Sequence, residues 1–544
     1  MDLMCSLFWA LRIFFGTLEA IPTRCATLFS RPRQTMASFR VSSAALFGLS
    51  ATPVTVEADV SSGLPRFQIV GLPDAAVSEA KDRVRAAIKN SGFPFPRTNV
   101  TINLAPADTR KQGPLYDLAI ALAILGAQGT IVNTRLLDRI VAIGELSLDG
   151  TIRPARGVLL ASSMAKRDGY SGILVAEENI SEARLVEPLQ ISSAWSLKDC
   201  IDQIEMGKWR SLPAVIDAER APSTKSAYDR ADDFALIAGQ LHAKRALEIA
   251  AAGGHNILLS GPPGSGKTML ARAFATLLPP PTIDESIEIT SIHSIAGLLH
   301  GQRITERPFR APHHTSSGIA LVGGGTQPRP GEISLAHRGV LFLDEFPEFS
   351  RSVLENLRQP LEDGTIVVSR AAGSVVFPAR FMLVASMNPC PCGFISDPGI
   401  ACTCTPGNIL KYQQKISGPL LDRIDLRVEV PRVAFDDLSS AAPCESSTAI
   451  CERVTAVRKL TQERYAPFGI FTNAELKPAL MKRWCTLTND GMALLKSAVD
   501  RLHMSARSYG RILKVARTIA DLAHEETISA AHLAEALQYR IRNA

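Results

Sequence analysis

The chain lacks both a strong charge excess and a disulfide framework, and each absence narrows what it can be. Its 59 Lys and Arg residues against 53 Asp and Glu residues give a formal charge of only +6 over 544 residues. Such a thin surplus permits nucleic-acid binding without requiring it. The ten cysteines do not have the spacing of a disulfide-stapled secreted protein. With 46% hydrophobic and 21% charged residues, the chain has an ordinary globular composition, and its length suggests about three or four domains.

A clean targeting or membrane-spanning segment is also missing from the start of the chain. Residues 3–18 are strongly apolar, but Arg12 interrupts them. The run is short for a membrane span, and it lacks the charged start and small-residue cleavage site of a signal peptide. A membrane anchor, a targeting peptide and an untranslated leader with Met36 as the first residue stay open, and the sequence favours the last. We therefore expect residues 1–37 to be an untranslated or disordered leader, and the protein to be cytoplasmic with no membrane partner.

A phosphate-binding loop is the most specific motif present. Residues 261–268 read GPPGSGKT, after an apolar run at 256–259 and before a predicted helix at 269–278. In this setting backbone N–H groups surround phosphate oxygens, the Lys reaches the β- and γ-phosphates, and the Thr hydroxyl holds Mg²⁺. The predicted ATP- and Mg²⁺-binding residues are Gly261, Pro262, Pro263, Gly264, Ser265, Gly266, Lys267 and Thr268.

Polar residues follow two later apolar runs in the order expected of an ATPase. Asp344 and Glu345 follow the run 340–343; Asp344 would help to hold Mg²⁺, and Glu345 would orient the attacking water. Asn388 follows the next run and would contact the γ-phosphate or position the water, although an Asn-Pro pair read alone more often marks a turn. The sequence therefore predicts ATP hydrolysis as well as ATP binding.

Two further positions predict arginine contacts to phosphate. Arg423 lies in GPLLDRID at 418–425, where a ring ATPase presents an arginine finger to its neighbour's γ-phosphate, a contribution of about 10³–10⁵ in rate. A single Arg in an apolar stretch more commonly forms an ion pair. Arg507, at the start of a predicted helix, is the candidate second phosphate sensor, and Arg511, one turn later, is its rival.

Four cysteines crowd into a short segment after Asn388. Cys390-Pro-Cys392 and Cys402-Thr-Cys404 are separated by nine residues. Four thiols so close together in a cytosolic protein predict a tetrahedral Zn²⁺ site, although C-x-C is tighter than the usual C-x₂-C spacing. Reduced thiols in a loop are the alternative.

The order of apolar patterns predicts the α/β fold class, with three folded parts. Residues 38–205 alternate predicted strands and helices, and residues 206–231, with prolines and mixed charges, are typical of a linker. The ATPase core with a parallel sheet is expected at 232–435. An all-α lid is expected at 436–544, although 436–470 are mixed and partly polar. The lid helices are predicted at 492–502, 508–524 and 529–539.

Several segments resemble the ComM/YifB family of magnesium-chelatase-like AAA+ ATPases. The similarity covers roughly residues 38–544 with matching domain order. It implies a hexameric AAA+ ring whose ATP hydrolysis drives branch migration of DNA during natural transformation. The implied partner is branched or single-stranded DNA, bound without sequence preference. The segments are the phosphate-loop region at 234–268, RPFRAPHHTSS at 307–317, GVLFLDEFPEF at 339–349, RQPLEDG at 358–364, ASMNPCPCG at 385–393 and ISGPLLDRIDL at 416–426.

The resemblance implies two additions to the core. One is an insertion in helix 2, at about Ile292 to Thr326, in which His313 and His314 are interpreted as polar turn residues rather than metal ligands. The other is a hairpin at about Thr365 to Phe377, which β-rich runs on both sides of Arg370 support. Its tip would face a central pore and contact phosphates in a salt-dependent way. A plain hairpin with a solvated Arg370 is the alternative.

The amino-terminal domain resembles the Lon-type protease domain, of the S5 domain 2-like fold. Residues 111–115 read KQGPL where Lon-type proteases have K-D-G-P-S, so Leu115 occupies the nucleophile's place. The expected lysine position falls near Leu159. Without a nucleophile and a base lysine a Ser–Lys dyad cannot form. The resemblance implies the protease fold, and these residues argue against protease activity.

Other functions stay open beside the DNA motor. One is the motor subunit of a magnesium chelatase, although no D-x-S-x-S integrin-type motif is evident. A second is a protein-remodelling AAA+ ATPase, and a third is a scaffold that binds nucleotide without turnover. The residues that argue against the scaffold are Lys267, Asp344, Glu345, Asn388 and Arg423.

Overall fold

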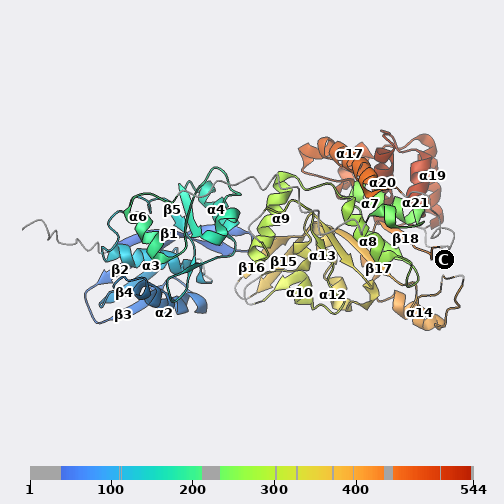
Figure 1. The fold of residues 1–544 in the computed structure, drawn as a ribbon. Helices are drawn as coiled ribbons and strands as arrows, with labels where there is room; N and C mark the ends of the chain where they lie inside the picture. The colour runs from blue at the N-terminus through green and yellow to red at the C-terminus, as the bar shows by residue number, and fades with distance from the viewer. Residues whose placement is uncertain are drawn as a thin grey trace, which may run out of the picture.

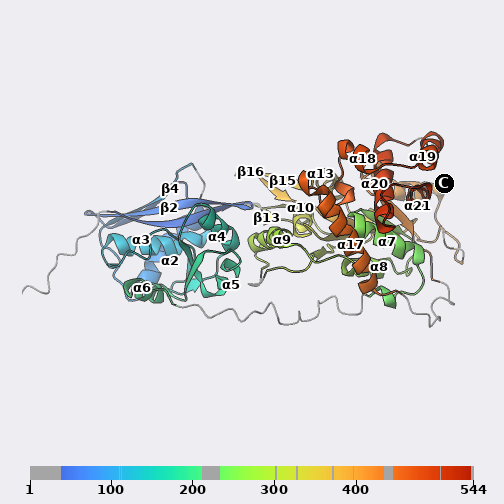
Figure 2. The same cartoon turned by 90° about the horizontal axis from the view of Figure 1, so that it is seen from above.

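A computed structural model shows an elongated molecule with an α/β part at one end and helices gathered at the other (Figures 1 and 2). The predicted leader and residues 211–231 of the predicted linker lie outside the described residues. The structure describes residues 38–540, without 109–110, 112, 211–232, 300–302, 326–328, 371–372, 396, 398, 434–444 and 503.

The amino-terminal part is built on a seven-stranded mixed sheet in the order β3-β4-β2-β1-β5-β8-β9. The alternating pattern at 54–60 predicted a half-buried strand, and β2 confirms it, with Val54, Val56 and Ala58 buried. The strands are β1 (Ser38–Phe47), β2 (Ser50–Ser61), β3 (Arg66–Val70), β4 (Asn99–Ala105), β5 (Ile140–Ala142), β8 (Gly172–Ala176) and β9 (Gln190–Ala194), with a small pair β6 (Glu145–Leu146) and β7 (Ile152–Arg153).

Helices pack on both faces of this sheet, since alternate residues of β8 belong to two separate clusters: Leu174 to the cluster of α2 and α3, and Ile173 to that of α4. Figure 2 shows these three helices beside the strands. Every residue of α3 is buried, which agrees with its nearly unbroken apolar sequence. The helices are α2 (Ala75–Asn90), α3 (Asp117–Ala127), α4 (Val158–Arg167), α5 (Ile180–Ala183) and α6 (Leu197–Glu205).

The central part is organised around a five-stranded sheet of order β11-β14-β17-β10-β18, in which every pair of neighbours is parallel. Parallel strands covered on both faces read as short continuous apolar runs, which is why the sequence located three of them. The strands are β10 (Ile257–Ser260), β11 (Phe309–Arg310), β14 (Val340–Leu343), β17 (Met382–Met387) and β18 (Leu426–Glu429). The helices are α7 (Leu241–Gly253), α8 (Lys267–Thr276), α9 (Ile283–Ala296), α10 (Gly318–Val322), α11 (Glu332–Leu335), α12 (Arg351–Glu355), α13 (Arg358–Asp363), α14 (Pro406–Gln413) and α15 (Gly418–Leu421).

The predicted extent of the helix 2 insertion, about 292–326, was wrong. Residues 309 and 310 form strand β11 of the central sheet, where they pair with Val340 and Leu341. The addition between β11 and β14 is instead a small antiparallel pair, β12 (Gly323–Gly324) and β13 (Arg329–Pro330). A two-residue strand leaves no periodic signal in the sequence, so the pattern could not separate it from an insertion.

The carboxyl-terminal part is helical within the described residues, as predicted, but α17 and the short α18 are not among the three helices predicted there. Helix α17 (Ser447–Tyr465) falls in the segment interpreted as mixed and partly polar. Its buried stripe includes Thr461 and Tyr465 beside three aliphatic residues, so the apolar periodicity is weak. The other helices are α18 (Pro478–Trp484), α19 (Asn489–Leu502), α20 (Ala506–Leu522) and α21 (Ala530–Gln538).

The predicted hairpin is confirmed as β15 (Thr365–Arg370) paired with β16 (Gly373–Pro378). The side chain of Arg370 lies outside the described part, so its predicted role stays a prediction. Leu49, in the turn between β1 and β2, packs against the core cluster that contains Val375 of β16. A Cβ added to Gly48 in that turn would lie 2.4 Å from Val375 Cγ1. The amino-terminal part therefore contacts the hairpin of the central part.

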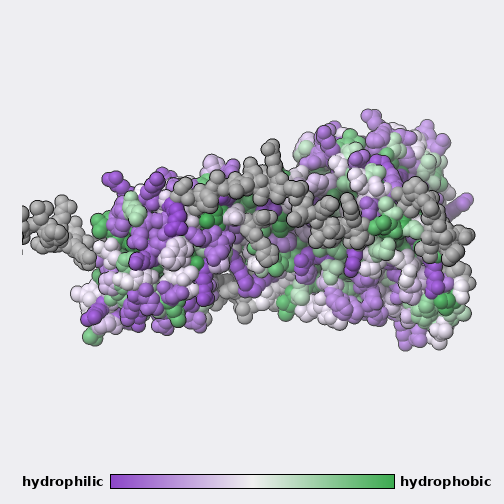
Figure 3. Space-filling model, in the orientation of Figure 1, coloured by the Kyte–Doolittle hydropathy of each residue, from purple (hydrophilic) through white to green (hydrophobic). Residues whose placement is uncertain are grey.

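The described helices include none long and apolar enough to cross a membrane. On the face shown in Figure 3, hydrophilic residues predominate and hydrophobic ones are scattered among them.

Candidate active site

The predicted phosphate loop joins the end of β10 to α8 and presents an open backbone. Gly264 and Gly266 adopt positive φ angles of 78° and 89°, and a Cβ on either would meet nothing within 4 Å. Gly261 lies against the chain, since a Cβ there would stand 2.1 Å from the carbonyl oxygen of Val430. The Ser265 hydroxyl is buried and has no hydrogen-bond partner among the described residues. Such an open cradle with an unpaired buried donor fits a phosphate group.

Lys267 is held inside this loop. Its ammonium donates hydrogen bonds to the carbonyl oxygens of Gly261 and Pro262, both at 2.8 Å, and to Asn388 Oδ1 at 3.3 Å. Burial lowers the pKa of Lys267 below its usual value, while Asp344 acts in the opposite direction. The Lys267 ammonium therefore lies inside the loop and has lost part of its hydration. An incoming phosphate would compensate for this loss.

Thr268 and Asp344 are adjacent, as the prediction of a shared Mg²⁺ requires. The Thr268 hydroxyl donates to Asp344 Oδ2 at 2.9 Å, and Ser386 Oγ donates to the other carboxylate oxygen. The backbone N–H of Glu345 also donates to Asp344 Oδ1, at 3.0 Å. Hydroxyl and carboxylate oxygens are the ligands that Mg²⁺ takes in nucleotide sites. These two side chains therefore fit an Mg²⁺ ion that arrives with ATP.

Three strand ends bring these groups together. The phosphate loop follows β10, Asp344 follows β14, and Asn388 follows β17. These three strands are neighbours and run parallel. The carboxyl ends of parallel strands meet at one edge of a sheet, where ligands of open α/β sheets bind. Sequence order alone predicted this meeting.

Glu345 has a partner that the sequence analysis missed. It takes a left-handed backbone conformation, with φ 52°, and His314 Nδ1 lies 3.2 Å from its Oε2. The His314 ring packs beside His313, with centroids 4.2 Å apart, and edge-on to Phe349. His314 follows β11, which pairs with β14. The pairing of β11 with β14 brings the residues that follow these strands together, and it would have predicted the His314–Glu345 contact. Because residues 309 and 310 were interpreted as part of an insertion, this pairing was not predicted.

Arg423 lies at the opposite edge of the sheet from the phosphate loop. It precedes β18, whose Leu426 pairs with Ile257 at the start of β10, and its carbonyl oxygen accepts a hydrogen bond from Asn256 Nδ2 at 3.1 Å. The whole of β10, about 13 Å at about 3.3 Å per residue, separates this position from the loop. Arg423 is not brought to the nucleotide site of its own chain.

Positive charges gather around Arg423. Burial, followed by the charges of Arg358, Arg507 and Arg511, lowers the pKa of Arg423 below its usual value. Glu362 pairs with its guanidinium, and only 8% of the residue is exposed. Arg507 is exposed at the start of α20, on the Arg423 side. Arg358, the first residue of the RQPLEDG segment, was not among the predicted site residues.

Arg511, the rival phosphate sensor, is engaged in holding the lid to the core. Its guanidinium donates to the carbonyl oxygen of Arg423 at 2.9 Å and pairs with the buried carboxylate of Asp425. His255 Nδ1 also lies 3.4 Å from that carboxylate. These contacts give Arg511 a structural role, and they leave Arg507 as the exposed arginine of the two.

The four predicted zinc ligands meet in space. The sulfur atoms of Cys390, Cys392, Cys402 and Cys404 all lie within 4.8 Å of one another. Cys390 is buried and the other three are partly exposed. The cluster follows Asn388 directly along the chain, at the same edge of the sheet as the phosphate loop.

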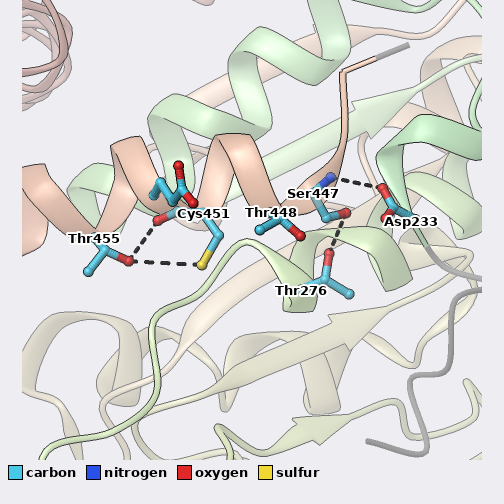
Figure 4. A pocket seen from close by; sticks show the side chains of 7 residues that line it. Asp233, Thr276, Ser447, Thr448, Cys451 and Thr455 are labelled. Atoms are coloured by element: carbon cyan, nitrogen blue, oxygen red, sulfur yellow. Dashed lines mark hydrogen bonds between the residues drawn. The ribbon is translucent and has the colours of Figure 1, made fainter. Parts of the chain in front are cut away.

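A pocket of about 520 Å³ opens elsewhere, between α8 and α17 (Figure 4). Ser447 N–H donates to Asp233 Oδ1 and Thr276 Oγ1 donates to Ser447 Oγ, both at 2.8 Å. Thr276 is nine residues beyond Lys267 along α8, about 13 Å at 1.5 Å per residue. These bonds fasten the first lid helix to the core, and the pocket is separate from the phosphate loop.

In the amino-terminal part the two positions that would form a Lon-type dyad carry leucines. Leu115 lies in the 3₁₀ turn Pro114–Tyr116, and Leu159 is buried in α4. Lys111 is buried and donates to the carbonyl oxygen of Pro106. Apolar side chains at both places offer neither nucleophile nor base.

Comparisons with known proteins assign the chain to a family. The family model described as "Magnesium chelatase, subunit ChlI" matches residues 233–438, "Subunit ChlI of Mg-chelatase" matches 56–179, and "Magnesium chelatase, subunit ChlI C-terminal" matches 444–540.

Full-length relatives agree with these matches. Competence protein ComM of Haemophilus influenzae is 45% identical over 505 residues, which cover 92% of this chain and 97% of ComM. Protein YifB of Escherichia coli is 43% identical over 503 residues, covering 91% and 96%. Protein Rv2897c of Mycobacterium tuberculosis is 44% identical over 508 residues, covering 93% and 99%. On these grounds, the protein belongs to the ComM/YifB family of magnesium-chelatase-like AAA+ ATPases.

Proposed function

We propose that this protein is an ATP-hydrolysing hexameric ring that drives branch migration of DNA during homologous recombination, including natural transformation. In each subunit the phosphate loop, Asp344, Glu345 and Asn388 hold ATP and Mg²⁺. The neighbouring subunit completes the site with Arg423. The observation that carries this proposal is the position of Arg423 at the sheet edge opposite the phosphate loop of its own chain.

The arginines around Arg423 support action on a neighbour. Like charges in a partly buried cluster repel one another, and an anion that arrives relieves the repulsion. The γ-phosphate of the adjacent subunit is such an anion. In this arrangement Arg507 reads the neighbour's phosphate together with Arg423, and the Arg423–Glu362 pair opens when the ring assembles.

DNA as the substrate is supported by the relative named ComM, a competence protein, and by the hairpin β15–β16. The hairpin lies in a ring's pore, where Arg370 contacts phosphates without reading sequence. The magnesium-chelatase and protein-remodelling alternatives share the same ATPase chemistry, and the difference between them is what stimulates turnover.

The amino-terminal part, at 38–205, is proposed as a Lon-like fold that has lost protease chemistry and serves as a binding domain. The linker is at 206–231, the ATPase core at 232–435 and the lid at 436–544.

Subunit mixing tests the shared site. Lys267→Ala removes nucleotide binding, and Arg423→Ala leaves binding intact and removes turnover. In a one-to-one mixture, interfaces that pair an intact loop with an intact Arg423 recover up to about a quarter of wild-type turnover. No recovery in rings that verifiably contain both variants would contradict action in trans.

Stimulation by nucleic acid tests the substrate. ATP turnover is expected to rise with branched DNA. The protein should also unwind a labelled three-strand junction with ATP but not with a non-hydrolysable analogue. Glu345→Gln is the matched control because it retains ATP binding and blocks turnover. Turnover that ignores DNA and rises with unfolded polypeptide or with a chelatase partner would favour an alternative.

A further inference from the structure

The cysteine cluster has the dimensions of a tetrahedral metal site. The sulfur atoms of Cys390 and Cys392 are 3.4 Å apart, those of Cys390 and Cys402 3.8 Å, and those of Cys392 and Cys402 3.5 Å. Four thiolates at about 2.3 Å from Zn²⁺ in a tetrahedron are about 3.8 Å from one another. The sulfur atoms therefore already stand close to the edges of a ZnS₄ tetrahedron.

Backbone donors point at these sulfur atoms. The N–H of Cys392 donates to Cys404 Sγ at 3.3 Å. Cys392 Sγ accepts from the N–H groups of Phe394 and Thr403, and Cys402 Sγ accepts from the N–H of Cys404. Such amide donors stabilise the negative charge of metal-bound thiolates. A disulfide would need sulfur atoms about 2.05 Å apart, whereas all four cysteines are free.

We propose that these cysteines bind one Zn²⁺ and that the metal fixes both the phosphate loop and the sensor Asn388 for nucleotide binding. The proposal rests on the nucleotide site of the proposed function and adds a metal requirement to it. Two contacts carry it, one on each side of the cluster.

The first contact is covalent continuity with the sensor. Cys390, the most buried ligand, lies two residues beyond Asn388, whose Oδ1 contacts the Lys267 ammonium. The backbone N–H of Asn388 donates to the Tyr412 hydroxyl. The Tyr412 hydroxyl thus holds the backbone N–H of Asn388, and the metal would hold Cys390 two residues later. Both restraints together fix the backbone of the sensor.

The second contact is with the phosphate loop. Gly393, one residue after Cys392, has φ 88° and packs against Pro263, since a Cβ there would lie 2.6 Å from Pro263 Cδ. The segment 390–393 therefore packs against the phosphate loop at Pro263. If metal loss leaves the loop in its binding conformation a tenth of the time, nucleotide affinity falls about tenfold.

Metal content is the first test. Protein purified with reductant from zinc-supplemented cells is expected to carry about one Zn²⁺ per chain. Replacing zinc with Co²⁺ should give the visible absorption of a tetrahedral tetrathiolate. A Cys402→Ser/Cys404→Ser variant should lose the metal, whereas Cys451→Ser, a partly exposed cysteine of α17 outside the cluster, should keep it. Protein without zinc, or a cobalt spectrum without thiolate bands, would overturn the site; the cobalt spectrum of the wild type decides this even if the double variant folds poorly.

Nucleotide affinity is the second test. A fluorescent ATP analogue is expected to bind about tenfold more weakly to metal-depleted protein than to zinc-loaded protein, with recovery when zinc is returned. Equal affinity in both forms would overturn the role in bracing the loop while leaving the metal site. Because neither measurement needs turnover or DNA, a failure of the proposed DNA motor would appear separately, in the junction assay.

Discussion

At the scale of single residues, the contact of His314 with Glu345 is the main feature of the site that the sequence did not predict. A carboxylate that orients water must have a free lone pair directed at the attacking position. In this chain His314 Nδ1 occupies Glu345 Oε2 at 3.2 Å. The histidine therefore occupies one oxygen of the carboxylate and restrains its orientation, and the left-handed backbone at Glu345 is part of that arrangement.

We expect His314→Ala to raise basal ATP turnover. Removing one ion-pair contact of about 1 kcal/mol corresponds to about a fivefold change. Affinity for a non-hydrolysable analogue should stay unchanged, because the phosphate loop is untouched. Steady-state turnover without DNA checks the first expectation, with His313→Ala as the control. Lower turnover in His314→Ala would show instead that the histidine helps Glu345 in the reaction.

At the scale of elements, the buried Arg511–Asp425 pair is one of the contacts that hold the lid to the core. Burial by itself would raise the pKa of Asp425, but Arg511 and His255 together lower it below its usual value. A lowered carboxyl pKa contributes stability above the unfolded-state value of about 4 and loses it as the pH falls below that value. The docking of α20 on the start of β18 should therefore weaken in acid.

Arg511→Ala is expected to destabilise the protein by about 3 kcal/mol, because it leaves the Asp425 carboxylate buried without its main partner. Arg507→Ala, one turn earlier and exposed, should leave stability unchanged and reduce turnover. Denaturant unfolding and ATPase assays on both variants separate the two roles. An Arg511→Ala protein as stable as the wild type, with turnover lost, would make Arg511 the phosphate sensor.

How well sequence predicted each element followed from its length and pattern. The parallel strands β10, β14 and β17 and the hairpin were found because each is a continuous apolar or β-branched run. Strand β11 has two residues and α17 carries a half-polar buried face, so neither gave a periodic signal. At the site, strand order predicted which loops meet, but the His314–Glu345 contact depended on the strand that was missed. The opposite location of Arg423 could not be deduced without the register of β18 on β10.

At the scale of the whole molecule, the amino-terminal part and the ATPase core are joined by direct contacts as well as by the chain. Ser294 Oγ of α9 donates to Glu182 in the buried end of the amino-terminal part, and Ile295 packs into its core cluster. Leu49 packs on the other side, against the cluster that contains the hairpin residue Val375. The two parts therefore contact each other both at α9 and near β16.

Leu49→Asp should loosen this contact, because it places a charge against an apolar cluster. The expected result is a larger radius of gyration in small-angle scattering, with circular dichroism unchanged. Leu64→Asp is the matched control, since Leu64 is 88% exposed in the same part. An unchanged radius in the Leu49 variant would mean that α9 alone holds the parts together.

The turn at Gly48 and Leu49 also bears on how the protein can be cut. This turn shields Val375, which is 3% exposed in the full chain. A fragment that begins at residue 233 lacks the turn and would therefore expose the apolar Val375 side chain to solvent. We therefore expect the isolated ATPase fragment to aggregate under conditions in which the intact protein does not. A polar replacement of Val375 should reduce the aggregation of the fragment.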